Sequence, residues 1–415
     1  MTKVKEKLYE HRFALIFFGI LLACSIIDFQ NVYSGIDTGL TYSIYAVDFS
    51  FGFCTRLLPG AVFNFLFNDI SVNKVCFYMI ALLIFCLISV SKFAEDFIDR
   101  FNKENRKQGI VIALFLVLTF FICFSAGDFL DILDFHWIIG AVIFLLLLRK
   151  NATCLVMPVL FFCVVMCHYG SMICYIPMFV IILMLKAVYS KEKKEKVFLI
   201  SIIGVSLISA IALFAYMLMF ELENIKFSLE EFNAILSSKG VTDFEYYNFP
   251  FFRETADLSK LTDNGDLVPL VQVDLSQPKI IVMIQTVINQ IQVHIALWNH
   301  SDIIFYALTF VPLVAFAFYV LIRSLKNEKG ARIRSLLYLA VMILIFFTVI
   351  SGLFMSTDTL RWCSHGIIVF STAFGYVIHN DVEIKEKVCC SLAKISDSFI
   401  YGYLLIYVSY LFVFI

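Results

Sequence analysis

Charged residues are scarce in this chain of 415 residues. Asp, Glu, Lys and Arg together make up 16% of it, whereas 61% is hydrophobic and Phe alone occurs 46 times. A water-soluble globular domain needs far more polar surface to cover its apolar interior, so this balance excludes that class. The net charge of −1 gives no support for a nucleic-acid partner.

The sequence also lacks the motifs of several enzyme classes. It contains no Walker motif, no G-x-G-x-x-G before a helix, no H-E-x-x-H and no G-x-S-x-G. An ATP-driven pump, a Rossmann enzyme, a zinc protease and a serine hydrolase are therefore unsupported. No internal repeat is visible, which counts against transporters built from inverted repeats. Most of the 12 cysteines lie inside apolar runs, which does not indicate a disulfide framework.

Long apolar runs are abundant instead. Stretches of about 20 apolar residues recur along the whole length, and each is long enough to cross the hydrocarbon as a helix. They predict an all-α polytopic integral membrane protein with about 11 transmembrane helices, interfacial helices and one large external loop. The expected spans are 13–29, 72–91, 109–126, a helix ending at Arg149, 153–167, a helix ending at Lys186, 197–220, 302–322, 335–355, 362–378 and 396–415.

Three regions follow from this pattern. Residues 1–220 form an N-terminal transmembrane region with an interfacial segment at 48–68, and residues 302–415 form a C-terminal transmembrane region. Residues 221–301 between them form an external loop region. Its apolar stretch 279–298 is predicted to be interfacial or re-entrant rather than a span.

Lys and Arg predict the orientation. Of the 32 such residues, all but eight fall in the segments assigned to the cytoplasm. This bias places the N-terminus inside and the C-terminus outside. The first apolar run has no small-residue cleavage site, so it is expected to stay as a helix. The Phe-, Ile- and Lys-rich composition is typical of an AT-rich bacterial genome, and we expect a bacterial plasma membrane.

Candidate functional residues gather on the outer side. Asp358, Arg361 and His365 interrupt two apolar runs at i, i+3 and i+7, so they share one helix face. Ionisable groups beside a bilayer core need a partner, a water-filled cavity or a function. A salt bridge between Asp358 and Arg361 would also be an ordinary structural device.

Three further sites have two interpretations each. Arg56, flanked by apolar residues, is either a headgroup anchor or a phosphate clamp. His168, at a helix end, is either a satisfied interfacial histidine or a catalytic group. The carboxylates of Asp128, Asp131 and Asp134 form either a solvated helix end or a site for proton transfer or a divalent cation such as Mg²⁺ or Mn²⁺.

Short motifs carry a resemblance. The run Asp48-Phe-Ser-Phe-Gly52-Phe-Cys-Thr-Arg56-Leu-Leu-Pro-Gly60, then His168, then Asp358-x-x-Arg361-Trp362 resembles bacterial polytopic proteins associated with surface-polysaccharide genes. The layout is similar to glycosyltransferases of the GT-C type and to Wzy or EpsG-like polymerases. Two features differ from those families: the first external carboxylates, Asp37 and Asp48, are eleven positions apart, and external arginines are sparse.

The resemblance implies a membrane glycosyltransferase or polymerase of surface polysaccharide. Its partners would be a sugar donor linked to polyprenyl (pyro)phosphate, a glycan acceptor and membrane lipid. The implied catalytic residues are Asp28, Asp37, Asp48, Asp128 and His168, and the implied substrate-binding residues are Arg56, Asp358, Arg361, Trp362 and His365. Asp131 and Asp134 would hold a divalent cation. The alternatives are a transporter or flippase for a polar or lipid-linked solute, and a non-catalytic membrane assembly subunit.

Overall fold

The computed structural model describes residues 11–35, 44–53, 56–126, 135–220, 229–239, 281, 285, 288, 300–325, 332–355 and 359–413. Every regular element in these ranges is a helix, which confirms the all-α prediction for this part of the chain. The main helices are α2 (Arg12–Gly35), α5 (Val72–Ile98), α6 (Arg106–Ala126), α7 (Phe135–Leu147), α8 (Met157–Cys167), α9 (Tyr175–Tyr189), α10 (Lys193–Phe220), α13 (His300–Leu325), α14 (Arg332–Met355), α15 (Thr359–Asn380) and α17 (Asp397–Val413). Shorter elements are η1 (Phe49–Phe51), α4 (Leu58–Leu66), η3 (Ala152–Val156), η4 (Tyr169–Met172), α11 (Leu229–Ser238) and α16 (Val382–Leu392).

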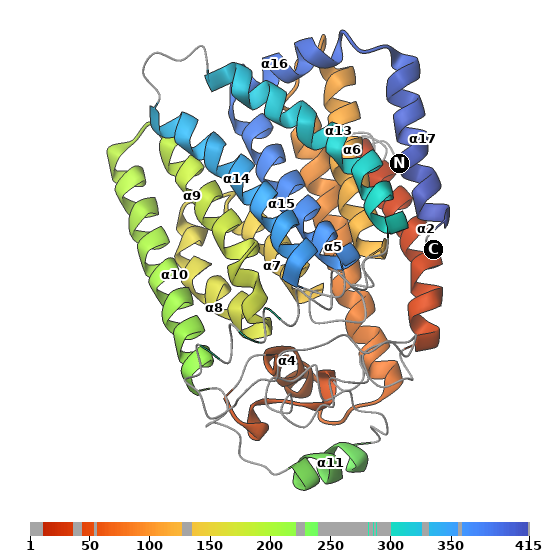
Figure 1. Cartoon of the computed structure of the whole chain (residues 1–415), viewed down its shortest axis with the longest axis vertical. Helices are drawn as coiled ribbons and strands as arrows, with labels where there is room; N and C mark the ends of the chain where they lie inside the picture. The colour runs from red at the N-terminus through yellow and green to blue at the C-terminus, as the bar shows by residue number, and fades with distance from the viewer. Residues whose placement is uncertain are drawn as a thin grey trace, which may run out of the picture.

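The long helices lie side by side in a bundle (Figure 1). α4 and α11 lie at one end of the bundle and α16 at the other, and we call these the α4 end and the α16 end. Ion pairs join distant segments at the α16 end: the Arg149–Asp96 pair at 2.5 Å and the Lys107–Asp397 pair at 2.7 Å. The basic segments predicted to share one side of the membrane therefore meet in space.

Three helical stretches are long and apolar enough to cross a membrane: Val72–Ile98, Gly170–Tyr189 and Lys193–Met217. A fourth span results if α16 and Asp397–Ile406, which meet at an angle of 99°, are counted together. α7 has 13 residues and α8 has 11, fewer than the about 20 that a span needs. Within the described residues the structure is thus consistent with a membrane protein, and the count of eleven spans is not confirmed.

One side of α10 carries exposed apolar side chains. It packs on α8 and α9, yet five apolar side chains spaced along it are exposed, namely Val197, Ile200, Val205, Ile208 and Ile211. In water such a stripe would promote aggregation or mark a binding surface. Along a helix that is apolar all round, it is the surface expected to contact lipid.

The core of the bundle is aromatic and closely packed around α7. The rings of Phe144 on α7 and Phe179 on α9 stack with centroids 4.2 Å apart. Trp137, Phe144 and Tyr175 are among the largest fully buried side chains. α7 is short because it lies inside the protein, where backbone polar groups at its ends can find partners other than water.

The predicted interfacial segment 48–68 folds as η1 followed by α4. Phe65 at the end of α4 is 87% exposed, as expected of a helix that lies on an apolar medium. The start of α4 approaches the preceding chain closely. A Cβ atom on Gly60 would lie 1.7 Å from the carbonyl oxygen of Val47 and 2.8 Å from that of Ile44, so only glycine fits there.

We expect Gly60→Ala to destabilise the protein by about 1–3 kcal/mol or more, because backbone atoms, which cannot rotate away, occupy the position of the new methyl group. Gly19→Ala in α2 is the matched control, since no atom lies within 4 Å of its Cβ position. Thermal unfolding of the purified protein in detergent measures both. Equal melting temperatures for the two variants would contradict the close approach.

Candidate functional site

The candidate site begins at Arg56, which joins η1 to α4. Among the described residues, Arg56 is the one non-glycine residue with positive φ, at 70°. This left-handed conformation costs an ordinary residue about 1–2 kcal/mol. It persists here because the Arg56 amide donates a 2.8 Å hydrogen bond to the Met166 carbonyl near the end of α8. The side chain is buried, at 6% exposure. Strain at a buried cation is a feature of functional sites.

The Arg56 side chain contacts His168. The distance from Arg56 Nη2 to His168 Nε2 is 2.6 Å. The Gly170 amide donates a 2.9 Å hydrogen bond to the other ring nitrogen, His168 Nδ1. Through this bond the His168 side chain caps the start of η4. Gly170 is needed for this turn, because a Cβ there would lie 2.9 Å from Nδ1 and 3.0 Å from the Trp137 ring.

The two contacts of His168 make conflicting demands. Both the guanidinium and the amide are donors, and a neutral imidazole has only one nitrogen that accepts. If Nδ1 accepts from Gly170, Nε2 carries the proton and faces Arg56 as a second donor. Both groups can donate to one acceptor oxygen, and an anionic oxygen suits an arginine best.

Aromatic rings continue the site across the bundle. Trp137 on α7 lies between two histidines, with ring centroids 5.2 Å from His168 and 4.9 Å from His365. His365 on α15 is fully buried, and its Nδ1 lies 2.9 Å from the hydroxyl of Tyr175 on α9. We call Arg56, Trp137, His168, Tyr175 and His365 the histidine cluster. It brings together five segments of the chain at the α4 end.

Asp48 caps η1 in the structure, and its predicted catalytic role stays a prediction. Its carboxylate accepts hydrogen bonds from the Ser50 amide at 2.8 Å and from Asn64 at 2.7 Å, so it caps η1 and ties it to α4. Burial raises the pKa of Asp48, but the bonds from Ser50 and Asn64 and the charge of Lys239 outweigh it, and the pKa lies below its usual value. Lys239, at the end of α11, donates to the Ala46 carbonyl at 2.5 Å. Burial lowers the pKa of Lys239, and the charge of Asp48 partly opposes this.

The remaining predicted residues are described in part or not at all. The backbones of Asp28 in α2 and of Arg361 and Trp362 in α15 are placed, with Arg361 one turn before His365, but their side chains lie outside the described structure. Asp37, Asp128, Asp131, Asp134 and Asp358 lie wholly outside it. Among the described residues no group of three His, Cys, Asp or Glu could hold a metal ion, so the cation prediction for Asp131 and Asp134 stays a prediction.

The structure adds Trp137 and Tyr175 to the predicted site. Both are aromatic residues in or beside apolar runs. From the sequence alone, such residues cannot be distinguished from ordinary core residues. The signal that could have found Trp137 is its place next to His136, at the start of a helix after three carboxylates. Tyr175 carries no comparable signal.

No protein-family model, curated protein or solved structure matches this chain. Function is therefore inferred from the geometry of the site and the chemistry of its residues.

The Asp48 interactions predict a pH dependence of stability. A carboxyl with a lowered folded-state pKa adds stability above about pH 4, the usual pKa of aspartate, and this stability is lost as the pH falls through the folded-state pKa. We expect Asp48→Ala to lower the free energy of unfolding by about 1–2 kcal/mol at pH 7. This difference from the wild type should shrink below about pH 4. Melting curves from pH 7 to pH 3 measure it. A difference that stays constant over this range would contradict the role of the charged form.

Tyr175→Phe should cost about 1–3 kcal/mol, because it removes the hydroxyl that contacts a buried ring nitrogen of His365. Tyr401→Phe, at an exposed position of α17, changes the same group and should have an effect within about 0.5 kcal/mol. Thermal unfolding in detergent compares them. If Tyr175→Phe melted like the wild type, the contact with His365 would have no energetic role.

Proposed function

We propose that the chain is an integral-membrane glycosyltransferase or polymerase of bacterial surface polysaccharide. It takes its sugar from a polyprenyl (pyro)phosphate donor at the outer face of the plasma membrane, and the α4 end is that face. The observation that carries the proposal is the contact between Arg56 and His168, whose geometry suits an anionic oxygen shared by the two. The distribution of Lys and Arg supports the orientation, because most of them belong to segments at the α16 end.

The transfer step has simple chemistry. The bond from the anomeric carbon of the sugar to the donor phosphate oxygen breaks, and a bond from the same carbon to the acceptor hydroxyl oxygen forms. The bonding electrons leave with the phosphate, whose negative charge grows in the transition state. Arg56 and His168 donate hydrogen bonds to that charge. Donors fixed before the reaction and shielded from water stabilise it most strongly.

The acceptor proton needs a carboxylate base. The candidates are Asp28, Asp37, Asp48 and Asp128, and the Asp48 carboxylate also caps η1. The second histidine, His365, is held by Tyr175, and the buried Trp137 ring packs between the two histidines. A sugar ring would therefore have to use aromatic side chains outside this cluster. Aromatic faces suit sugar rings. A divalent cation at Asp131 and Asp134 would supply further positive charge to the phosphate.

A transporter or flippase for a lipid-linked solute is the second candidate. It is favoured by a cavity at the α16 end with the hydroxyl groups of Ser371 and Thr372 in its lining. A transporter needs polar groups at depth on both sides of its central barrier. The two candidates differ in the side of the membrane on which lipid-linked sugar accumulates when the protein is inactive. Loss of a transferase leaves it outside, and loss of a flippase leaves it inside.

Arg56→Lys tests both candidates. Lysine keeps the charge and the left-handed strain but loses the fork that holds a phosphate. In cells that carry the variant at the normal protein level, we expect surface polysaccharide to fall about 10²-fold, the usual loss when one such donor is removed. The measurements are the glycan chain-length profile and the amount of polyprenyl-linked sugar in extracted membranes.

Accumulated lipid-linked sugar that periodate oxidises in intact cells lies outside and supports a transferase. Sugar that periodate reaches only after lysis lies inside and supports a flippase. Lys74→Gln is the control, because Lys74 is a cation in the first turn of α5 that pairs with Asp69. An unchanged glycan profile for Arg56→Lys, or an equal loss for Lys74→Gln, would exclude the proposed function.

A further inference from the structure

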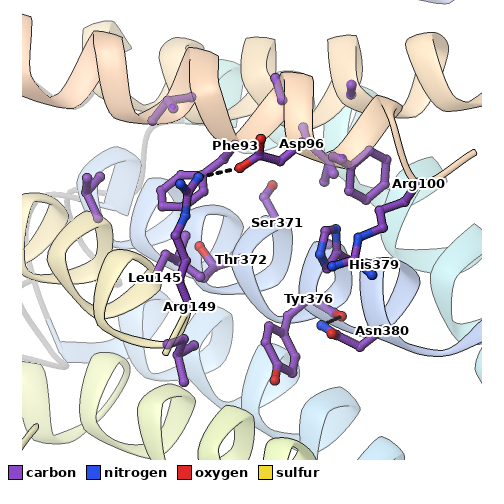
Figure 2. A pocket seen from close by; sticks show the side chains of 18 of the residues that line it. Phe93, Asp96, Arg100, Leu145, Arg149, Ser371, Thr372, Tyr376, His379 and Asn380 are labelled. Atoms are coloured by element: carbon purple, nitrogen blue, oxygen red, sulfur yellow. Dashed lines mark hydrogen bonds and ion pairs between the residues drawn. The ribbon is translucent and has the colours of Figure 1, made fainter. Parts of the chain in front are cut away.

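A cavity of about 780 Å³ lies at the α16 end, remote from the histidine cluster. Its walls come from α5, α6, α7, α9, α15 and the start of α10 (Figure 2). From the sequence, only the Lys and Arg required by topology were expected at this end. The volume falls within the range of sites for small ligands, about 300–1,000 Å³.

The carboxylates at the rim of the cavity are already engaged. Each of the three has donors of its own, namely Arg149 for Asp96, Arg106 for Asp99, and Ser190 and Asn151 for Glu195. The Arg149 guanidinium also lies over the Phe93 ring, 4.9 Å from its centroid. Lys186 donates to the Leu148 carbonyl at 2.7 Å. These groups shape the rim, and each of them already has at least one partner within the protein.

Two further groups of the lining can donate to a ligand. Arg100 lies beside His379 in Figure 2, and among the described residues it forms no ion pair. His379 is held by stacking on Phe97, with centroids 6.2 Å apart and an interplanar angle of 27°. A guanidinium next to an imidazole favours a ligand rich in acceptors, and phosphate matches the guanidinium best.

The hydroxyl groups of Ser371 and Thr372 line the cavity beside apolar side chains. Ser371 is 7% exposed, and its Oγ has no hydrogen-bond partner in the described structure. Figure 2 shows it with Thr372 on the stretch of α15 that lines the cavity. Ala113, Val117 and Ala141 line the wall as small apolar surfaces. A buried hydroxyl is normally paired, so this one points to a ligand acceptor within an apolar surrounding.

We propose that the α16-end cavity binds the phosphate headgroup of an anionic lipid. Arg100 and His379 donate to the phosphate oxygens, Ser371 donates to an ester carbonyl of the lipid, and the chains lie along the Ala113 and Ala141 wall. Anionic lipids of the cytoplasmic leaflet are attracted to basic segments of the kind found at this end. This binding site goes beyond the proposed function and does not depend on it.

The test is thermal unfolding of the purified full-length protein in detergent, titrated with dioleoyl phosphatidic acid. Dioleoyl phosphatidylcholine and sodium phosphate are separate arms. We expect a saturable rise in melting temperature with phosphatidic acid and none with phosphatidylcholine, which has the same chains but no net charge. Arg100→Gln should weaken the apparent affinity about tenfold. Ser371→Ala should weaken it severalfold and tests the floor of the cavity independently.

Lys103→Gln is the matched control, because Lys103 is exposed near Arg100, lies outside the cavity lining and carries the same charge. Equal weakening by Arg100→Gln and Lys103→Gln, or an equal response to phosphatidylcholine, would mean general adsorption of lipid and would overturn the proposal. Sodium phosphate could also raise the melting temperature in a way that depends on Arg100. If phosphatidic acid gave no larger rise, the cavity would be assigned to a soluble anion and the lipid assignment would be overturned.

Discussion

A buried arginine held against a histidine is the constraint on which the α4 end depends. A guanidinium removed from water must be balanced by partners or it destabilises the fold. The Arg56 side chain lies 2.6 Å from His168, and its backbone adopts a left-handed conformation in which its amide donates to the Met166 carbonyl. The turn at Gly170 then leaves room for both His168 and Trp137. Backbone strain, a required glycine and aromatic packing thus lie together around one charge at this end.

α15 connects the two polar regions of the molecule. His365, Thr372, Tyr376 and His379 stand at i, i+7, i+11 and i+14 and therefore share one face of the helix. His365 belongs to the histidine cluster, and the other three line the α16-end cavity. Ile368, between them, is fully buried. One helix face thus carries a polar site at each end and a closed apolar layer between them, which gives the two ends separate chemistry.

Much of the fold and part of the candidate site could be predicted. Apolar runs indicate helices because each run must bury or shield its backbone, and the predicted helix 72–91 corresponds to α5. α5 nevertheless extends to Ile98. In this extension Lys92 forms ion pairs with both Glu95 and Asp96, which support the helix. Arg56, His168 and His365 were recognisable as polar residues beside apolar runs. Trp137 and Tyr175 were not, because an aromatic residue in such a run looks like core.

The sequence by itself determined the all-helical class, the approximate positions of most long helices and the likeness of the chain to a membrane protein, because these depend on local composition and spacing. Only the tertiary structure decided which polar groups meet. Arg56 and His168 are 112 residues apart, and Tyr175 and His365 are 190 apart. The α16-end cavity likewise depends on which faces of six helices meet. Such contacts are set by packing between distant segments, and packing leaves no local pattern in the chain.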